Sequence, residues 1–272
     1  MNFSEKIKER LSKFKNEKFP GLENGKWKKN NQPYPHILPE KYKFDNLLPA
    51  YKNEFIDFLK NHNIKLHPDF HHLNSSQAMC FNFFFPLYYE RKLEIITDFL
   101  GFKNEVIDYD SVCFEKDGLE AKFGRRPTSF DFYFKTQSSK DLFFEIKYTE
   151  GGYGKAKINK EKFDQVYSNF LKPIKSNFHK AQPFFDNYQI LRNLVHIAEN
   201  SYVIFIFPED NNLVNNDSKR VKSEFLNENF QEHFFAVDWQ TIFNKVSDSL
   251  TISKMHKQYS DFKEKYLLQK HD

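Results

Sequence analysis

The chain of 272 residues carries 41 Lys and Arg against 37 Asp and Glu, a formal net charge of +4, and 18% of its residues are aromatic. This aromatic content indicates a globular interior and excludes disorder for most of the chain, although 29% of the residues are charged. The net charge is too small to indicate nucleic-acid binding by itself, so the distribution of charge along the chain has to decide that question.

The cysteine content and the apolar segments indicate the compartment. Only Cys80 and Cys113 occur, both in apolar stretches, which favours small buried side chains in a reducing environment over a disulfide framework or a metal cage. Residues 1–19 are amphipathic and lack the apolar core of a signal peptide. No segment approaches the roughly 18 consecutive apolar residues of a membrane span. We therefore expect a soluble cytoplasmic protein without a membrane partner.

The first 72 residues are expected to form a helical arm and a loop. The spacing of Phe3, Ile7, Leu11 and Phe14 predicts a helix that ends before Pro20 and Gly21. Three prolines within residues 25–39 exclude regular structure there, and a short helix is expected to start near Pro49. Residues 73–272 are expected to form the main domain.

Helix and strand patterns alternate through this main domain. Asn74, Ser75 and Ser76 offer an N-cap to a helix that Pro86 kinks or restarts, and Gly101 is a plausible C-cap for the segment that follows. Strands are expected at residues 112–114, 128–135, 142–149, 202–207 and 233–238, with helical patterns near 163–170, 185–195 and from about 252 onwards. The apolar run 202–207 predicts a strand covered on both faces. This order predicts an α/β fold, a central mixed sheet with helices on both faces.

Residues 129–148 predict a β-hairpin with one apolar and one polar face. Alternation places Phe130, Phe132 and Phe134 on one face of the first strand, opposite Asp131, Tyr133 and Lys135, and it places Leu142, Phe144, Ile146 and Tyr148 on one face of the second, opposite Phe143, Glu145 and Lys147. A three-residue turn at 137–139 pairs Phe132 with Phe144, Phe134 with Leu142, Lys135 with Asp141 and Asp131 with Glu145. A slip by one residue would mix the two faces and is disfavoured.

This register brings two carboxylates and one ammonium together. Cross-strand Cβ atoms lie about 4.5 to 5.5 Å apart, which is close enough for Asp131 and Glu145 to bind one hard divalent ion. Such an ion lowers the pKa of a bound water and neutralises charge on a phosphate under attack. Lys147, two residues past Glu145, is placed to orient the water or to stabilise the developing charge. The alternative is a solvated polar face with a cross-strand salt bridge.

The segments around this hairpin carry a resemblance to a known superfamily. Residues 124–131 (GRRPTSFD) and 143–154 (FFEIKYTEGGYG) resemble the PD-(D/E)XK superfamily, the restriction-endonuclease-like nucleases. Residues 73–87 and 188–192 are similar to a restriction-endonuclease-like subgroup, so the resemblance covers roughly residues 73–207. One departure is that Ser129-Phe130 stands where the name of the superfamily implies Pro.

The resemblance implies a restriction-endonuclease-like fold and a Mg²⁺-dependent deoxyribonuclease, with Mn²⁺ as a possible substitute ion. It assigns Asp131 and Glu145 as metal ligands and Lys147 as the catalytic cation. DNA is the expected partner and an endonuclease the expected type, while RNA as substrate, exonucleolytic cutting and a homodimer are left open. The alternative function is a catalytically inactive nucleic-acid-binding or structural module of the same fold.

Several other residues are candidates with an alternative interpretation. Arg125 and Arg126 are expected either to clamp a phosphate or to be exposed loop charges, and Lys155 and Lys157 either bind nucleic acid or lie on a solvated face. Gly151, Gly152 and Gly154 either let the backbone approach a phosphate or form a mobile turn. A further acidic ligand is expected from a set among which the sequence does not choose: Glu90, Glu94, Glu115 and Glu120.

Overall fold

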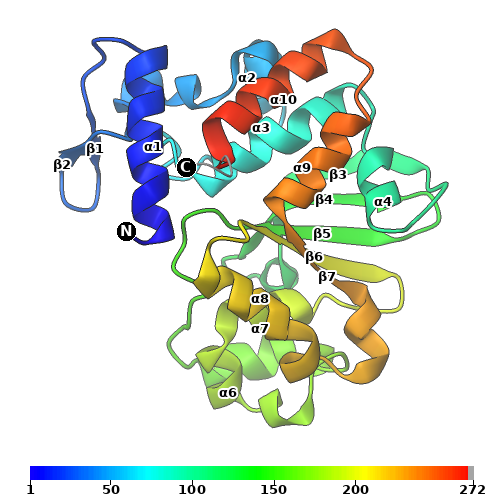
Figure 1. Cartoon of the computed structure of the whole chain (residues 1–272). Helices are drawn as coiled ribbons and strands as arrows, with labels where there is room; N and C mark the ends of the chain where they lie inside the picture. Colours follow the sequence, from blue (N-terminus) through cyan, green and yellow to red (C-terminus); the bar gives the residue numbers. More distant parts are fainter. Residues whose placement is uncertain (269–272) are drawn as a thin grey trace. The chain divides into compact units, whose positions relative to one another are not determined.

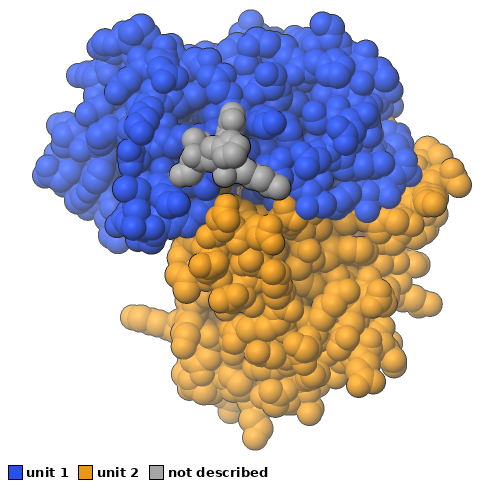
Figure 2. Space-filling model, viewed as in Figure 1, with its two compact units in different colours: residues 1–99, 239–272 blue, residues 100–238 orange. Residues whose placement is uncertain are grey.

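The computed structural model describes residues 1–268, which form two compact units. Unit 1 combines residues 1–99 with the segment that begins at Trp239, and unit 2 comprises Leu100–Asp238 (Figure 2). The boundary expected between residues 72 and 73 falls inside unit 1. The helix that follows this boundary packs against the carboxy-terminal helix, where Tyr259 Oη donates to the Phe83 carbonyl oxygen at 2.6 Å.

Unit 1 is mainly helical (Figure 1). Its elements are α1 (Phe3–Lys18), β1 (Gly25–Trp27), β2 (Gln32–Tyr34), η1 (Glu40–Asn46), η2 (Pro49–Tyr51), α2 (Lys52–Asn61), α3 (Ser76–Tyr89), α4 (Glu94–Phe99), α9 (Trp239–Asp248) and α10 (Ser253–Tyr266).

The amino-terminal helix and the capped helix of unit 1 are confirmed. A capping box between Asn2 and Glu5 starts α1, which buries Ile7 and Leu11. Ser75 caps α3 by accepting from the Ala78 N–H at 3.3 Å. Pro86 lies inside α3, which continues to Tyr89 before the separate α4.

Unit 2 is built on a five-stranded mixed sheet in the order β3-β4-β5-β6-β7. The first three strands are antiparallel, whereas β5, β6 and β7 are parallel, so helical crossovers connect them. The elements of unit 2 are β3 (Ile107–Asp117), η3 (Leu119–Phe123), β4 (Ser129–Thr136), β5 (Asp141–Ile146), α5 (Lys160–Lys162), η4 (Phe163–Tyr167), η5 (Ser168–Phe170), η6 (Ser176–Phe178), α6 (Ala181–Asp186), α7 (Tyr188–Leu194), β6 (Ser201–Phe207), α8 (Asn212–Phe225), η7 (Glu228–His233) and β7 (Phe234–Asp238).

The strand β6 lies inside the sheet, between β5 and β7, and its residues 203–207 are buried. This confirms the expectation of a strand covered on both faces, because apolar side chains fill both sides of a central strand. The helices α6, α7 and α8 contribute to a hydrophobic core with one face of the sheet, through residues such as Phe184, Leu191 and Val221 (Figure 1). The fold is therefore of the predicted α/β class, a mixed sheet flanked by helices.

Several segments differ from the expectation. Residues 25–39, expected as a loop without regular structure, contain the short strands β1 and β2, in which Pro33 lies opposite Lys26. The strand expected at residues 142–149 ends at Ile146. The strand expected at residues 112–114 runs from Ile107 to Asp117 and contains an irregularity between Asp108 and Cys113. The helix expected at residues 163–170 is a π-helical turn followed by a 3₁₀ turn, and the short α-helical segment α5 precedes it. Along residues 1–268, no helix combines the length and apolar character needed to cross a membrane.

Candidate active site

The β4–β5 hairpin has the predicted register and turn. Phe132 pairs with Phe144, Phe134 with Leu142, and Lys135 with Asp141. The Thr136 N–H donates to the Lys140 carbonyl at 3.0 Å, which closes the three-residue turn 137–139, and Ser139 there has a φ of 67°. The polar residues of the hairpin are thus held by a rigid ladder.

Asp131 lies where this ladder ends. Continuing the register places Asp131 opposite Glu145, yet Asp131 Oδ2 accepts a hydrogen bond from the Ile146 N–H at 2.6 Å. The Ile146 N–H therefore donates to the side-chain oxygen of Asp131, where a regular ladder would offer a backbone carbonyl of β4. This bond holds the half-buried carboxylate beside β5.

The faces of β4 are not as regular as predicted. Phe130 does not share a face with Phe132 and Phe134, because its ring contacts Phe143 and His196, with ring centroids 4.9 Å and 4.8 Å away. Phe132 packs instead against Phe144, which alternates with Phe143 on β5. The alternation of side chains between the two faces of β4 is therefore broken at Asp131. The β3 residue opposite Asp131 is Glu115, which has a positive φ.

Glu115 of β3 is one of the four candidates for an additional acid. Its neighbours Phe114 and Lys116 pair with Phe132 and Phe130, so the register sets Glu115 opposite Asp131, with a φ of 55°. Burial, then the nearby carboxylates of Glu145 and Glu115, raise the pKa of Asp131 well above its usual range. Three carboxylates therefore gather at this end of the hairpin.

The other three candidate acids have different surroundings. Glu90 in unit 1 accepts a hydrogen bond from Tyr51 Oη at 2.8 Å, and Glu94 begins α4 in the same unit. Glu120 is buried in unit 2, where its Oε1 accepts from Tyr167 Oη at 2.7 Å and from Tyr188 Oη at 3.1 Å. Glu120 thus belongs to a hydrogen-bonded network that involves α7.

Glu145 and Lys147 form a buried ion pair. The distance from Lys147 Nζ to Glu145 Oε1 is 2.9 Å, and both side chains are less than a tenth exposed. Arg192 of α7 approaches the other oxygen, with 3.8 Å from Nη2 to Oε2. Burial acts to raise the pKa of Glu145, but Lys147 and Arg192 outweigh it and lower that pKa, so the carboxylate is ionised.

Lys147 is fixed by its backbone and by its side chain. Its N–H donates to the Ile206 carbonyl at 2.8 Å, which extends the β5–β6 ladder by one residue, and Nζ lies 5.2 Å from the centre of the Tyr153 ring. Burial acts to lower the pKa of Lys147, but Glu145 and Glu150 outweigh it and raise that pKa. The site therefore holds a charged ammonium.

The glycine-rich segment after β5 is tied to the rest of unit 2. Gly152 has a φ of 112°, which favours glycine, and the next N–H, of Tyr153, donates to Asp217 at 3.3 Å. The Gly154 N–H donates to Gln189 Oε1 of α7 at 2.8 Å. Two backbone donors of this segment are thus bound by side chains of the chain itself.

The predicted nucleic-acid-binding residues lie outside this cluster. Arg125 pairs with Glu161, at 2.6 Å from Nη2 to Oε1, and the same Nη2 donates to Gln165. Arg126, Lys155 and Lys157 are exposed. Of the two arginines expected to clamp a phosphate, Arg125 is therefore already engaged within the protein.

The carboxylates of the cluster offer oxygen ligands, the type that a hard divalent ion prefers. No group of three or more His, Cys, Asp and Glu side chains within residues 1–268 is arranged to hold a metal. Mg²⁺, however, is commonly held by one or two carboxylates together with water and substrate phosphate oxygens. Burial, and after it repulsion from Glu145 and Glu115, raises the pKa of Asp131, and a cation would relieve this repulsion.

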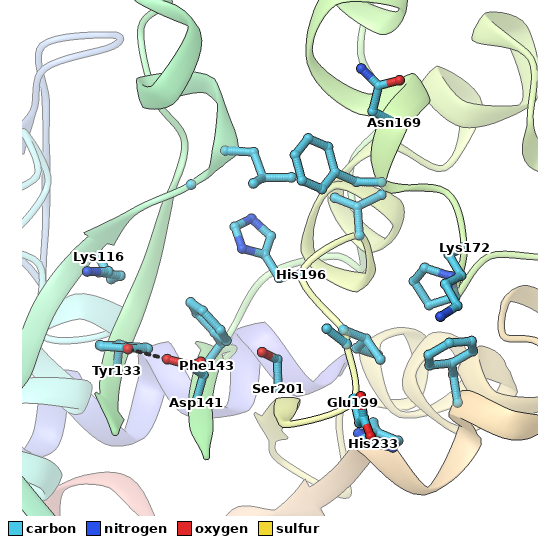
Figure 3. A pocket seen from close by; sticks show the side chains of 18 of the residues that line it. Lys116, Tyr133, Asp141, Phe143, Asn169, Lys172, His196, Glu199, Ser201 and His233 are labelled. Carbon is cyan, nitrogen blue, oxygen red and sulfur yellow. Dashed lines mark hydrogen bonds between the residues drawn. The ribbon is translucent and has the colours of Figure 1, made fainter. Parts of the chain in front are cut away.

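Unit 2 also contains a cavity of about 820 Å³, whose lining includes none of Asp131, Glu145 and Lys147 (Figure 3). Phe143, two residues before Glu145, lines it together with Tyr133 and with His196, which follows α7. Burial lowers the pKa of His196 to about 3, so this imidazole is neutral at pH 7. Lys116 and Lys172 also line the cavity, which therefore combines aromatic rings with cations.

The sequence alone assigned no role to Arg192 or Asn193. The segment 188–192 was noted only for its similarity to a restriction-endonuclease-like subgroup. The contact of Arg192 with Glu145 depends on how α7 packs against the sheet, and no local spacing records that packing. The sequence does contain one usable signal, because Arg192 is a charged residue next to the apolar Leu191 in a predicted helix.

The five-stranded mixed sheet flanked by helices, which contains the β4–β5 hairpin, is consistent with a restriction-endonuclease-like fold. A family model described as Restriction Endonuclease associating with ARP matches residues 8–267, and the chain belongs to this family. Comparison with curated proteins found no match, and neither did comparison with solved structures.

Proposed function

We propose that this protein is a metal-dependent nuclease of the PD-(D/E)XK type that hydrolyses DNA phosphodiester bonds, with an endonuclease as the expected type. The observation that carries the proposal is the buried Glu145–Lys147 pair beside Asp131, since three ionisable groups converge where an ordinary core would place apolar side chains. Membership in a restriction-endonuclease family supports a DNA substrate.

Asp131 and Glu145 would hold the ion, Mg²⁺ or Mn²⁺ in its place. A bound divalent ion supplies charge neutralisation for the phosphate and a more acidic water. Asp131 is kept in position by the Ile146 N–H, and Glu145 stays ionised because Lys147 and Arg192 are close to it. Lys147 keeps its proton and stabilises negative charge that develops on the phosphate.

The family description also names an association with ARP, and we propose that this chain acts beside such a partner. A homodimer stays a prediction. The alternative function, a nucleic-acid-binding module without turnover, predicts DNA binding that no divalent ion converts into cleavage.

The test is incubation of the protein with plasmid and linear DNA, and separately with RNA, at increasing Mg²⁺ and with a chelator as control. Products are separated on a gel to distinguish nicks, discrete fragments and progressive loss. Glu145→Gln should abolish cleavage. Lys147→Ala should lower turnover by a factor on the order of 10² to 10³, the scale for losing one preorganised stabilising group.

Lys147→Ala also separates catalysis from simple charge balance. If Lys147 only neutralised Glu145, saturating Mg²⁺ would restore near-normal cleavage in the variant. Absence of cleavage by the wild-type protein under every metal condition, with DNA binding intact, would support the binding module instead.

A further inference from the structure

The helix α7 brings two polar side chains, Arg192 and Asn193, close to Glu145. Arg192 Nη2 is 3.8 Å from Glu145 Oε2, an ion-pair distance that is too long for a hydrogen bond. Arg192 Nε and Asn193 Nδ2 are both buried without a hydrogen-bond partner among the described residues. Buried donors are rarely left unpaired in folded proteins, so Arg192 Nε in particular calls for an acceptor.

The position of these donors is fixed by the packing of α7. Tyr188 Oη, at the first residue of the helix, donates to the buried Glu120 at 3.1 Å and accepts from Lys162 at 2.6 Å. Gln189 exchanges hydrogen bonds with Gly154 in both directions. Asn193 itself is 1% exposed, and its amide is near enough to help lower the pKa of Glu145 while Nδ2 makes no hydrogen bond of normal geometry.

At Glu145 itself, two cations meet one carboxylate, and this local charge favours an anionic acceptor. Lys147 is already paired with Glu145 at 2.9 Å, so Arg192 is a second cation at one carboxylate. A guanidinium remains charged at any relevant pH, and its planar donors match two oxygens of a tetrahedral oxyanion. An amide N–H beside it adds one further donor to such a group.

We propose that Arg192 and Asn193 form a seat for one phosphate group of the nucleic-acid backbone, next to Glu145. This inference rests on the proposed function, since it identifies the residues that receive the phosphate at that site. The guanidinium would bind two phosphate oxygens, and the Asn193 amide would donate to one of them. The opposing account is that Arg192 only balances the charge of Glu145 and touches no ligand.

Binding can be measured without cleavage. Fluorescence anisotropy with a labelled DNA duplex, in Ca²⁺ and at one fixed salt concentration, compares the wild type with Arg192→Gln, Arg192→Lys and Asn193→Leu. The matched control is Arg91→Gln, which removes the same charge from an exposed residue of unit 1. Circular dichroism and thermal unfolding of each variant show whether it is folded.

Arg192→Gln should weaken DNA binding about tenfold or more, the scale for losing a charge-assisted hydrogen bond. Arg192→Lys should recover only part of this loss, because a point charge does not reproduce two parallel donors. Asn193→Leu should weaken binding less, and Arg91→Gln little. Inorganic phosphate should raise the melting temperature of the wild type more than that of Arg192→Gln, and it should compete with DNA.

A folded Arg192→Gln that binds DNA as tightly as the wild type would overturn the proposal, as would full recovery by Arg192→Lys. Stabilisation of the wild type by inorganic phosphate, without any effect of Arg192→Gln on DNA affinity, would overturn the proposal as well. Arg192 and Asn193 would then bind free phosphate and not the DNA backbone. Failure of the nuclease function looks different: the wild type would bind DNA through Arg192 but never cleave it.

Discussion

Asp131 accepts a hydrogen bond from the Ile146 N–H while it faces two other carboxylates, Glu145 and Glu115. The first interaction favours the charged form of Asp131, and the repulsion together with burial opposes it. The net effect is a raised pKa. Without a cation, the folded protein is therefore destabilised by ionisation of Asp131.

Asp131→Asn should raise the stability of the metal-free protein at neutral pH. The amide oxygen still accepts from Ile146, and the like charge is removed. Because the folded-state pKa is raised, the cost in the wild type is absent below the unfolded-state value of about 3.9 and grows as the pH rises towards the folded-state value. The advantage of the variant, measured by urea unfolding with chelator present, should therefore shrink towards pH 4.

The same unfolding measurement is then repeated with Mg²⁺ in place of the chelator. Mg²⁺ should stabilise the wild type and not Asp131→Asn, since a ligand stabilises only the state that binds it. Asp210→Asn, at an exposed aspartate of unit 2, is the control and should change stability little in either condition. An equal stability difference between wild type and Asp131→Asn at pH 4 and pH 8 would mean that ionisation of Asp131, which burial and repulsion both disfavour, does not cause that difference.

At the scale of elements, the site depends on how α7 is held. Glu120 Oε1 accepts from Thr128 Oγ1 at 2.9 Å, from Lys162 Nζ at 3.2 Å, and from the hydroxyls of Tyr167 and Tyr188. The buried carboxylate thus joins the segment before β4 to the helices after β5. Burial acts to raise the pKa of Glu120, but the hydrogen bonds from Tyr167 and Thr128, with the charge of Lys162, lower it.

Glu120→Ala should reduce the free energy of unfolding by about 3 to 5 kcal/mol, the scale for breaking a buried ion pair, because the donors around it lose their acceptor. Glu161→Ala, which breaks the exposed pair with Arg125, should cost no more than about 1 kcal/mol. A lowered folded-state pKa gives stability that is present above the unfolded-state value of about 4.3 and lost as the pH falls through the folded-state value. The difference between wild type and Glu120→Ala should therefore narrow in acid, and a constant difference in urea unfolding from pH 7 to pH 3 would contradict this account.

The elements also show how far the sequence could be read. The hairpin register was predictable because alternation, turn length and the pairing of Lys135 with Asp141 all agree on it. The face of the sheet on which Phe130 lies was not predictable, since it depends on the positive φ of Glu115 on another strand. Likewise, residues 160–170 depart from the local helical pattern in a segment where Tyr167 donates to the buried Glu120, a tertiary contact that the local pattern does not record.

The candidate site also contains residues that the sequence could predict and residues that only tertiary packing brings together. Asp131, Glu145 and Lys147 lie within 17 residues of one another in the sequence, so local strand geometry was enough to bring them together. Glu115 could be named only as one of four acids, because choosing it requires the β3–β4 register with its irregularity. Arg192 comes from a helix 45 residues after Lys147, and only tertiary packing decides its approach to Glu145.

At the scale of the whole molecule, the net charge is only +4. Binding of DNA should therefore depend on local groups of basic residues and not on the total charge. Lys155 and Lys157 are exposed in the segment between β5 and α5, a few residues beyond Lys147. Arg125, by contrast, is occupied by Glu161. Contacts of Lys155 and Lys157 with phosphates would appear in the salt dependence of binding rather than in the fold.

DNA affinity of the wild type should fall steeply with salt, and Lys155→Ala combined with Lys157→Ala should flatten the slope of log K against log salt by up to about 2, because each phosphate contact contributes about 0.9 to it. The matched control is Lys41→Ala combined with Lys43→Ala, two lysines of the same spacing in unit 1. Anisotropy titrations at four or more salt concentrations in Ca²⁺ measure both slopes. A slope unchanged by the first pair would mean that these lysines are only solvated, whereas an equal loss from both pairs would indicate an effect of net charge instead of contacts beside the site.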